Sequence, residues 1–228
     1  MVCAPAWSIC GAQKRFSNDA PMAPLLSSLL IFFALGVYGL VHSWLASLQA
    51  KRWARRLLGD LPVDRYYRLA YNLFAVVSLL PVMAMVTLLP DRPLYVIPFP
   101  WVMLTLAVQG LAVLALLVGL LQTGVMDFLG LRQLVVSSRG GNGQLVKDGL
   151  YRWVRHPLYT AGLVFIWFSP VMSTNLLAFF AGLSVYLVIG AYFEERKLIL
   201  VYGDAYRRIQ QNTPMFIPRT FGPPASKE

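Results

Sequence analysis

The feature that most constrains this chain is a set of long segments without Lys, Arg, Asp or Glu. Leu25–Leu48, Leu69–Leu89 and Trp101–Leu121 are three of them, and Leu158–Phe193 is a longer fourth. A helix of roughly 20 apolar residues spans the hydrocarbon core of a bilayer. Because only 13% of all residues are charged and the mean hydropathy is +0.59, the chain has too few charges to cover a soluble globule. A soluble enzyme and a disordered chain are therefore excluded.

The fourth segment is too long for one membrane span. It is interrupted by Ser169-Pro170 and by Ser173-Thr174-Asn175, small and polar residues that favour turns. These interruptions predict a helical hairpin, with a short span from Leu158, a tight turn and a second span from about Leu176 to Phe193. No segment alternates with period two, as membrane β-strands would. The sequence thus predicts an all-α, polytopic membrane helix bundle of five transmembrane helices, which ends in a C-terminal helical hairpin and a cytoplasmic tail.

The basic residues indicate the orientation of this bundle. All but three of the 20 Lys and Arg residues lie between spans one and two, between spans three and four, or after span five. The exceptions are Lys14, Arg15 and Arg92. Since cytoplasmic loops carry the excess of Lys and Arg, we expect a multi-pass protein of a bacterial inner membrane, with its N-terminus outside and its C-terminus in the cytoplasm. The net charge of +10 then reflects topology, and no nucleic-acid partner is expected.

The N-terminal extension raises two further expectations. Lys14-Arg15 before an apolar run is typical of a signal peptide, but the basic loop after Leu48 belongs in the cytoplasm, which makes the first span an anchor. Met22 directly precedes this span, and we expect translation to start there, which a mass spectrum of the native protein tests. The cysteines, Cys3 and Cys10, both lie in this extension and are too few for a metal site.

The polar residues that carry chemistry gather around the start of span four. Pro157 suits the first turn of a helix, which places Arg155 and His156 beside free backbone donors that can cradle a carboxylate or phosphate. The hairpin brings Glu194 and Glu195, at the cytoplasmic end of span five, close to His156. Such a set fits a zwitterion, and nearby aromatic rings attract onium cations, so S-adenosylmethionine matches all of these groups. The rings are Tyr151, Trp153, Tyr159, Tyr192 and Tyr206.

Structural explanations compete with this interpretation. Tyr and Trp at a membrane boundary usually form interfacial belts, and Arg152 and Arg155 serve equally well as topology signals. The two glutamates fit a solvated helix end, although acids are unfavourable near a helix C-terminus. His42, deep in span one, is a functional candidate, but we prefer a hydrogen bond to a neighbouring helix. With His156 as the only other histidine, no metal site is expected.

A family resemblance runs through about the last 90 residues. Gly149–Tyr159, Glu194-Glu195 and Thr213–Pro218 resemble the integral-membrane methyltransferases, the group of isoprenylcysteine carboxyl methyltransferases and phospholipid N-methyltransferases. His42-Ser43 and Asp127–Gln133 resemble the nurim-like branch of this group, which includes bacterial methanethiol S-methyltransferases. The resemblance implies S-adenosylmethionine bound between spans four and five and the tail.

The resemblance also implies roles for individual residues. Glu194 matches the acid that holds the cofactor's amino group, and Arg155 matches a residue that orients the carboxylate or the pocket. Arg155, His156 and Tyr159 are the expected catalytic residues. The residues that match cofactor-contacting positions are Gln144, Leu145, Val146, Tyr151, His156, Pro157, Leu158, Tyr159, Glu194 and Glu195. Three regions follow: an extension over 1–24, substrate-side helices over 25–126, and a loop, hairpin and tail over 127–228 that form the cofactor site.

The sequence defines the acceptor of the methyl group less closely than the cofactor. The prenylcysteine enzymes carry an arginine four residues before the first glutamate, whereas this chain has Gly190, which favours a small thiol or another lipophilic nucleophile. Arg155 and Arg132 would favour the thiolate form, so no strong general base is required. Two alternatives stay open: an NADPH-dependent membrane reductase of the sterol type, although Thr160-Ala161-Gly162 departs from its motif, and a non-catalytic nurim-like membrane protein. The sequence leaves the oligomeric state open.

Overall fold

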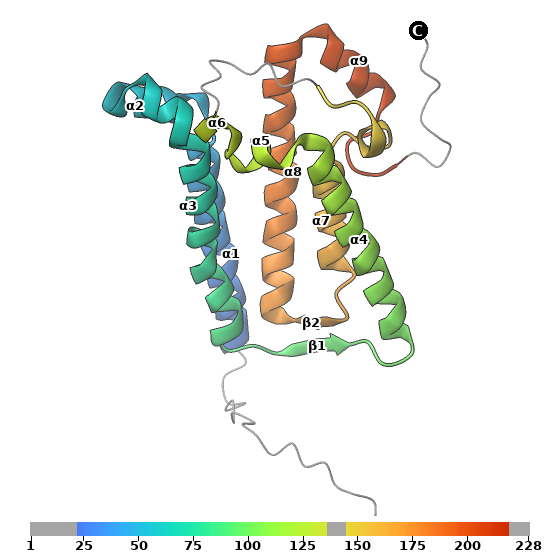
Figure 1. Cartoon of the computed structure of the whole chain (residues 1–228). Coiled ribbons are helices and arrows are strands. Elements are labelled where there is room, and N and C mark those ends of the chain that lie inside the picture. Colours follow the sequence, from blue (N-terminus) through green and yellow to red (C-terminus); the bar gives the residue numbers. More distant parts are fainter. Residues whose placement is uncertain (1–21, 136–144, 219–228) are drawn as a thin grey trace, which may run out of the picture.

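The computed structural model describes residues 22–135 and 145–218 of the chain (Figure 1). Residues 1–21, which include Cys3 and Cys10, and the predicted site residue Gln144 lie outside the described residues. The elements in chain order are α1 (Met22–Leu45), α2 (Leu48–Leu58), α3 (Asp60–Leu88), β1 (Pro93–Val96), α4 (Trp101–Thr123), α5 (Val125–Leu129), α6 (Arg132–Val135), the 3₁₀ helix η1 (Gly149–Arg152), α7 (Pro157–Trp167), β2 (Val171–Ser173), α8 (Thr174–Tyr202) and α9 (Asp204–Asn212).

Four of these helices are long and apolar enough to cross a membrane: α1, α3, α4 and α8. They correspond to the predicted first, second, third and fifth spans, and the protein is a multi-pass integral membrane protein. The predicted fourth span is the eleven-residue helix α7. At 1.5 Å per residue it covers only about half of a bilayer core, so the structure has four long spanning helices where the sequence predicted five spans.

The long helices run side by side and meet through small residues. Helix α1 packs along α8 and α3, and α4 packs along α7. At Gly182 on α8 an added Cβ would lie 2.8 Å from the Leu35 side chain, and Gly39 on α1 faces the Tyr186 ring equally closely. Missing side chains let helix backbones approach, as is usual in membrane bundles. The buried core between α1, α3 and α8 consists of Ile31, Leu35, Val82, Val86 and Phe179.

One end of the bundle is closed by two short strands, which the all-α prediction missed. Strand β1 pairs with β2 in an antiparallel sheet (Figure 1). Beside it, Asp91 accepts hydrogen bonds from the Asn175 backbone N–H at 3.0 Å and the Thr174 hydroxyl at 2.9 Å, which caps α8. Burial opposes ionisation of Asp91, but hydrogen bonds from Ser173, Asn175 and Thr174 outweigh it and lower its pKa. Strands this short depend on a partner about 80 residues away, which no local pattern reveals.

The other end carries the basic helix α2, which is steeply inclined to α1 and α3 and points away from the other helices (Figure 1). The first span ends at Leu45 rather than Leu48 because the Ser47 hydroxyl accepts a hydrogen bond from Ala50 N–H and starts α2. At the same end of the bundle α8 continues to Tyr202. The two glutamates therefore lie two turns before the end of their helix, and the expectation of acids at a helix C-terminus was wrong.

Candidate active site

A cavity of about 290 Å³ lies where α7 begins, beside the last turns of α8. Helix α4 contributes its final residue, the segment before η1 contributes apolar side chains, and α9 closes one side. Aromatic hydroxyls, one carboxylate and the first turn of α7 give the cavity its polar groups. The lining residues are Thr123, Leu145, Val146, Tyr151, Arg155, His156, Pro157, Leu158, Tyr159, Glu194, Leu198, Tyr202, Tyr206 and Ile209.

The first turn of α7 is formed as the sequence predicts, with Pro157 at its first position. The preceding backbone is held by the tail, because Arg155 N–H donates to the Pro214 carbonyl at 2.9 Å and His156 N–H to Met215 at 3.2 Å. Among the described residues, none accepts a hydrogen bond from the N–H of Leu158 or Tyr159. Two backbone donors at the positive end of a helix thus stay available beside the cavity.

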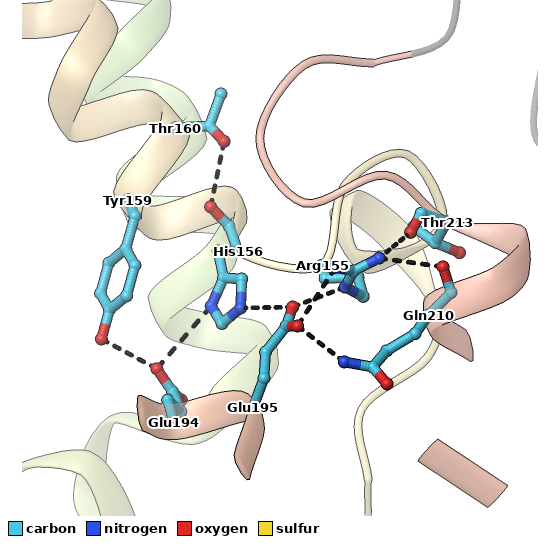
Figure 2. A network of polar contacts seen from close by, with 8 residues as sticks. All are labelled: Arg155, His156, Tyr159, Thr160, Glu194, Glu195, Gln210 and Thr213. Atoms are coloured by element: carbon cyan, nitrogen blue, oxygen red, sulfur yellow. Dashed lines mark hydrogen bonds and ion pairs between the residues drawn. The ribbon is translucent and has the colours of Figure 1, made fainter. Parts of the chain in front are cut away.

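Behind this turn lies a network of buried polar contacts centred on Glu195 (Figure 2). Arg155 Nε donates to Oε1 of this carboxylate at 2.6 Å, and His156 Nε2 lies 3.1 Å from the same oxygen. Gln210 of α9 donates to Oε2 at 2.7 Å, and the Arg155 guanidinium also donates to the Thr213 carbonyl. The network joins the start of α7, the end of α8, α9 and the tail, so one carboxylate holds together the walls of the cavity.

Glu194, the neighbouring residue, has a different environment. Its Oε2 accepts a hydrogen bond from the Tyr159 hydroxyl at 2.9 Å and lies 3.7 Å from His156 Nδ1 (Figure 2). The His156 ring stacks on the Tyr159 ring with a centroid distance of 5.3 Å. The side chain of Glu194 is 47% exposed, whereas that of Glu195 is 9% exposed. Glu194 therefore offers a carboxylate to the cavity, and Glu195 does not.

Two tyrosines of the cavity stay protonated far above neutral pH. Burial, and next the charge of Glu194, raise the pKa of Tyr151 to about 12. Burial, and next the charge of Glu195, raise the pKa of Tyr206, which is 3% exposed. Neither hydroxyl titrates in the physiological range. That of Tyr206 hydrogen-bonds Glu195, and that of Tyr151, which lines the cavity, can hydrogen-bond a ligand.

The structure brings together most of the residues that the sequence singled out. Every predicted catalytic or cofactor-contacting residue of the described chain lines the cavity except Glu195, which lies behind it and binds Arg155 and His156. Of the five aromatic rings expected around the ligand, Trp153 and Tyr192 do not line the cavity. Sequence reasoning missed Thr123, Tyr202 and Ile209. The four-residue spacing from Glu194 through Leu198 to Tyr202 places these residues on successive turns of one helix face, a signal that could have found Tyr202.

The described residues hold no cluster of three or more His, Cys, Asp or Glu side chains that would suit a metal ion. The polar groups that the described residues bring to the site are the network around Glu195, the exposed carboxylate of Glu194, the tyrosine hydroxyls and the backbone donors of α7.

Comparisons with known proteins agree on one family. The family model for phospholipid methyltransferases matches residues 101–205. A methanethiol S-methyltransferase of Crocosphaera subtropica is 28% identical over 85% of this chain and 76% of its own length. A methanethiol S-methyltransferase of Mycobacterium tuberculosis is 29% identical over 90% of this chain and 84% of its own. A protein-S-isoprenylcysteine O-methyltransferase of Schizosaccharomyces pombe is 34% identical over 37% of each chain.

No solved structure matches the chain significantly. The matched relatives are methyltransferases, which confirms the family expected from the motifs and favours neither the reductase nor the non-catalytic alternative. This chain is a methyltransferase and belongs to the membrane methyltransferase family of the phospholipid and isoprenylcysteine methyltransferase type.

Proposed function

We propose that this membrane methyltransferase binds S-adenosylmethionine in the cavity at the start of α7 and methylates a small thiol such as methanethiol. The observation that carries the proposal is Glu194, a half-exposed carboxylate that faces the cavity across from free backbone donors of α7. The methanethiol S-methyltransferases that resemble most of the chain support the choice of a thiol acceptor.

The cavity residues fit the groups of this cofactor. The Glu194 carboxylate suits an ammonium group, and the N–H groups of Leu158 and Tyr159 suit a carboxylate. The tyrosine rings suit a sulfonium, and Leu145 and Val146, with Gln144 beside them in the sequence, suit the nucleoside. When bound, S-adenosylmethionine supplies a methyl group on a positively charged sulfur, which is a good electrophile.

The predicted catalytic residues receive positioning roles in this proposal. Arg155 already donates to Glu195 and to the carbonyls of Gln210 and Thr213, so it holds the pocket walls instead of the cofactor carboxylate. His156 and Tyr159 orient the Glu194 carboxylate through their contacts with its Oε2. A wall that is fixed before the ligand binds keeps the reacting atoms aligned and excludes water.

We further propose five membrane crossings with the N-terminus outside and the cofactor site in the cytoplasm. Tyr159, near the start of α7, contacts Glu194, whereas β2 directly precedes the opposite end of α8. Between Thr174 and Glu194, α8 rises about 30 Å, so the stretch 157–173 covers a bilayer thickness even though its helix is short. The basic residues then lie on the cytoplasmic side, and the chain divides into a substrate side over 25–126 and a cofactor side over 127–228.

A binding and product experiment tests the proposal. Detergent-purified protein is titrated with S-adenosylmethionine and, separately, NADPH, and is then incubated with S-adenosylmethionine and methanethiol. We expect S-adenosylmethionine to bind, Glu194→Gln to weaken that binding strongly, and dimethyl sulfide and S-adenosylhomocysteine to form in equal amounts. Binding of NADPH alone would overturn the cofactor. Cofactor binding without methylation of any thiol would overturn the acceptor but not the cofactor.

A further inference from the structure

A second polar centre lies outside the cavity, among helices α1, α3 and α8. We name it the His42 cluster: His42 with Tyr38, Tyr71 and Tyr186. Tyr71 hydrogen-bonds His42 Nε2, and the three tyrosine rings surround the imidazole at centroid distances of 4.7 to 5.9 Å. The expected hydrogen bond of His42 to a neighbouring helix is therefore present. It uses only one ring nitrogen.

The other ring nitrogen, His42 Nδ1, is buried and has no hydrogen-bond partner among the described residues. Buried polar atoms are almost always paired, and an exception calls for an explanation. A small ligand that donates a hydrogen bond to this atom would satisfy it. In the tautomer that carries its hydrogen on Nε2 and donates it to Tyr71, Nδ1 holds a free lone pair, which is the state of a base.

The His42 cluster and the cavity lie at the same end of the bundle. On α8, Tyr186, Gly190 and Glu194 follow one another at one-turn spacing, which leads from the cluster to the cavity. Tyr186 of the His42 cluster and Glu194 of the cavity therefore lie about two helical turns apart on α8, with Gly190 between them.

Two glycines lie between the His42 cluster and the cavity. Gly190 lies one turn from Glu194 on α8, and Gly162 lies one turn from Tyr159 on the antiparallel helix α7. A Cβ added at either glycine would meet no heavy atom of the surrounding described chain within 4 Å. Both glycines are partly buried. Space thus exists beside the hydrogen bond between Tyr159 and Glu194, on the side that faces the His42 cluster.

A thiol acceptor needs a group that removes its proton. Reference thiols are mainly protonated at neutral pH, and the thiolate is the nucleophile. The sequence led us to expect the charges of Arg155 and Arg132 to favour the thiolate. In the structure, however, the Arg155 guanidinium is paired with Glu195, which compensates its charge, and Arg132 does not line the cavity. A neutral base near the cavity would therefore have to accept the proton of the thiol. Among the described residues, His42 offers such a base through its unpaired Nδ1.

We propose that the acceptor thiol binds in the space left by Gly190 and Gly162 and donates its proton to His42 Nδ1. The inference rests on the proposed function and deepens it. The S–H bond breaks as the proton moves to Nδ1, and the sulfur forms a bond to the methyl carbon of S-adenosylmethionine. The bond between that carbon and the sulfonium breaks, and its electron pair stays on the sulfur of S-adenosylhomocysteine. His42 later releases the proton to water.

A matched pair of thiols tests the role of His42. Ethanethiol and 2,2,2-trifluoroethanethiol have similar shapes, but the fluorines make the second thiol more acidic, so it depends less on a base. We expect His42→Gln to lower kcat/KM by about 100-fold or more for ethanethiol and by no more than about 10-fold for the fluorinated thiol. Affinity for S-adenosylmethionine should stay unchanged, which also reports correct folding. Equal losses for both thiols would mean a structural role and overturn the proposal.

Tyr71→Phe gives an independent test if the histidine variant does not fold. It keeps the ring and removes the hydroxyl that orients the imidazole. We expect the same selectivity between the two thiols with a smaller loss, and no selectivity would overturn the proposal.

Nuclear magnetic resonance gives a readout other than activity. The chain has two histidines, His42 and His156, so ring nitrogens labelled with ¹⁵N give few signals. Ethanethiol is added to the complex with S-adenosylhomocysteine, which cannot transfer a methyl group. We expect the Nδ1 signal of His42 to move with little change at His156. No movement at saturating thiol would overturn the proposal, whereas absent thiol turnover in the wild type would overturn the proposed function itself.

Filling the space between the helices tests where the acceptor binds. Gly190→Val should fold, because a Cβ there meets no neighbour, and should raise KM for ethanethiol by at least about 10-fold without changing cofactor affinity. Gly36→Val is the matched control, since Gly36 also has open space around its Cα but is exposed on the outside of α1. Equal KM values for the two variants would contradict this location.

Discussion

The Glu195 network and the His42 cluster are two buried polar centres at one end of the same bundle, but they are completed differently. Glu195 accepts hydrogen bonds from an arginine, a histidine and a glutamine, and its charge is balanced by Arg155. The His42 cluster is made of neutral rings, and one buried nitrogen in it lacks a partner among the described residues. The first centre is complete within the protein, and the second one is not.

This difference suggests a structural role for the Glu195 network and a ligand-binding role for the His42 cluster. A fully paired buried network joins the elements that contribute to it and is costly to break at any single point. An incomplete one costs stability in the free protein and regains it when a ligand supplies the missing hydrogen bond. Glu194 is intermediate between a fully paired and an unpaired group, because one of its oxygens is paired and its side chain is half-exposed to the cavity.

The largest effect is expected from breaking the complete centre. Glu195→Ala leaves Arg155 buried without its counter-ion, and removal of one partner of such a pair costs about 3–5 kcal/mol of folding free energy. Chemical unfolding in detergent, followed by circular dichroism, measures this loss. Glu194→Ala is the control at the adjacent position and should change the free energy of unfolding by less than about 1 kcal/mol. Equal losses of unfolding free energy in the two variants would contradict the structural role assigned to Glu195 alone.

The second effect concerns binding instead of folding. Glu194→Gln keeps the shape of the side chain but removes its charge, and a hydrogen bond to a charged group contributes about 1.5–3 kcal/mol. We expect the affinity for S-adenosylmethionine to fall by about 10- to 100-fold, measured by isothermal titration, while the unfolding midpoint stays close to that of the wild type. A stable variant with wild-type affinity would remove Glu194 from the cofactor site.

A third polar centre, at the opposite end of the bundle, sharpens the comparison. Asp91 caps α8 and is well paired but less buried than Glu195, so Asp91→Ala should cost only about 0.5–2 kcal/mol of stability. Because folding lowers the pKa of Asp91, its contribution is present above the unfolded pKa of about 3.9 and is lost as the pH falls through the lower folded value. Thermal unfolding at neutral and acidic pH measures both effects.

The control for Asp91 is Asp60→Ala, which removes an exposed carboxylate whose contact with Arg55 is 3.8 Å long. It should leave the thermal stability nearly unchanged. A destabilisation by Asp91→Ala that does not decrease at acidic pH would contradict the role of the ionised cap.

The smallest effect is expected at Tyr151, which lines the cavity without belonging to the Glu195 network. Tyr151→Phe keeps the ring and removes one hydroxyl, so the affinity for S-adenosylmethionine should fall by about 2- to 10-fold. Since the pKa of this tyrosine is raised to about 12, the pH dependence of binding in the neutral range should be the same in both proteins. A change in that pH dependence would contradict a permanently neutral hydroxyl.

Much of this protein could be predicted from the sequence because the decisive signals are local. Charge-free apolar segments define α1, α3, α4 and α8, and Pro157 marks the first turn of α7. The motif from Gly149 to Tyr159, together with Glu194, predicts most of the residues that line the cavity. The count of five spans went further than the structure does, because the predicted fourth span holds only the eleven-residue helix α7.

Only the tertiary structure decided which of these polar residues face the cavity and which are paired with other buried groups. Adjacent residues on a helix point about 100° apart, so Glu194 faces the cavity while Glu195 turns towards Arg155, and no pattern in the chain distinguishes them. His42 has ring partners on α3 and α8, and Asp91 accepts hydrogen bonds from residues of α8 that lie more than 80 positions away. Hydrophobic length and charge act along the chain and can be read from it, whereas the pairing of buried polar groups depends on which helices pack together.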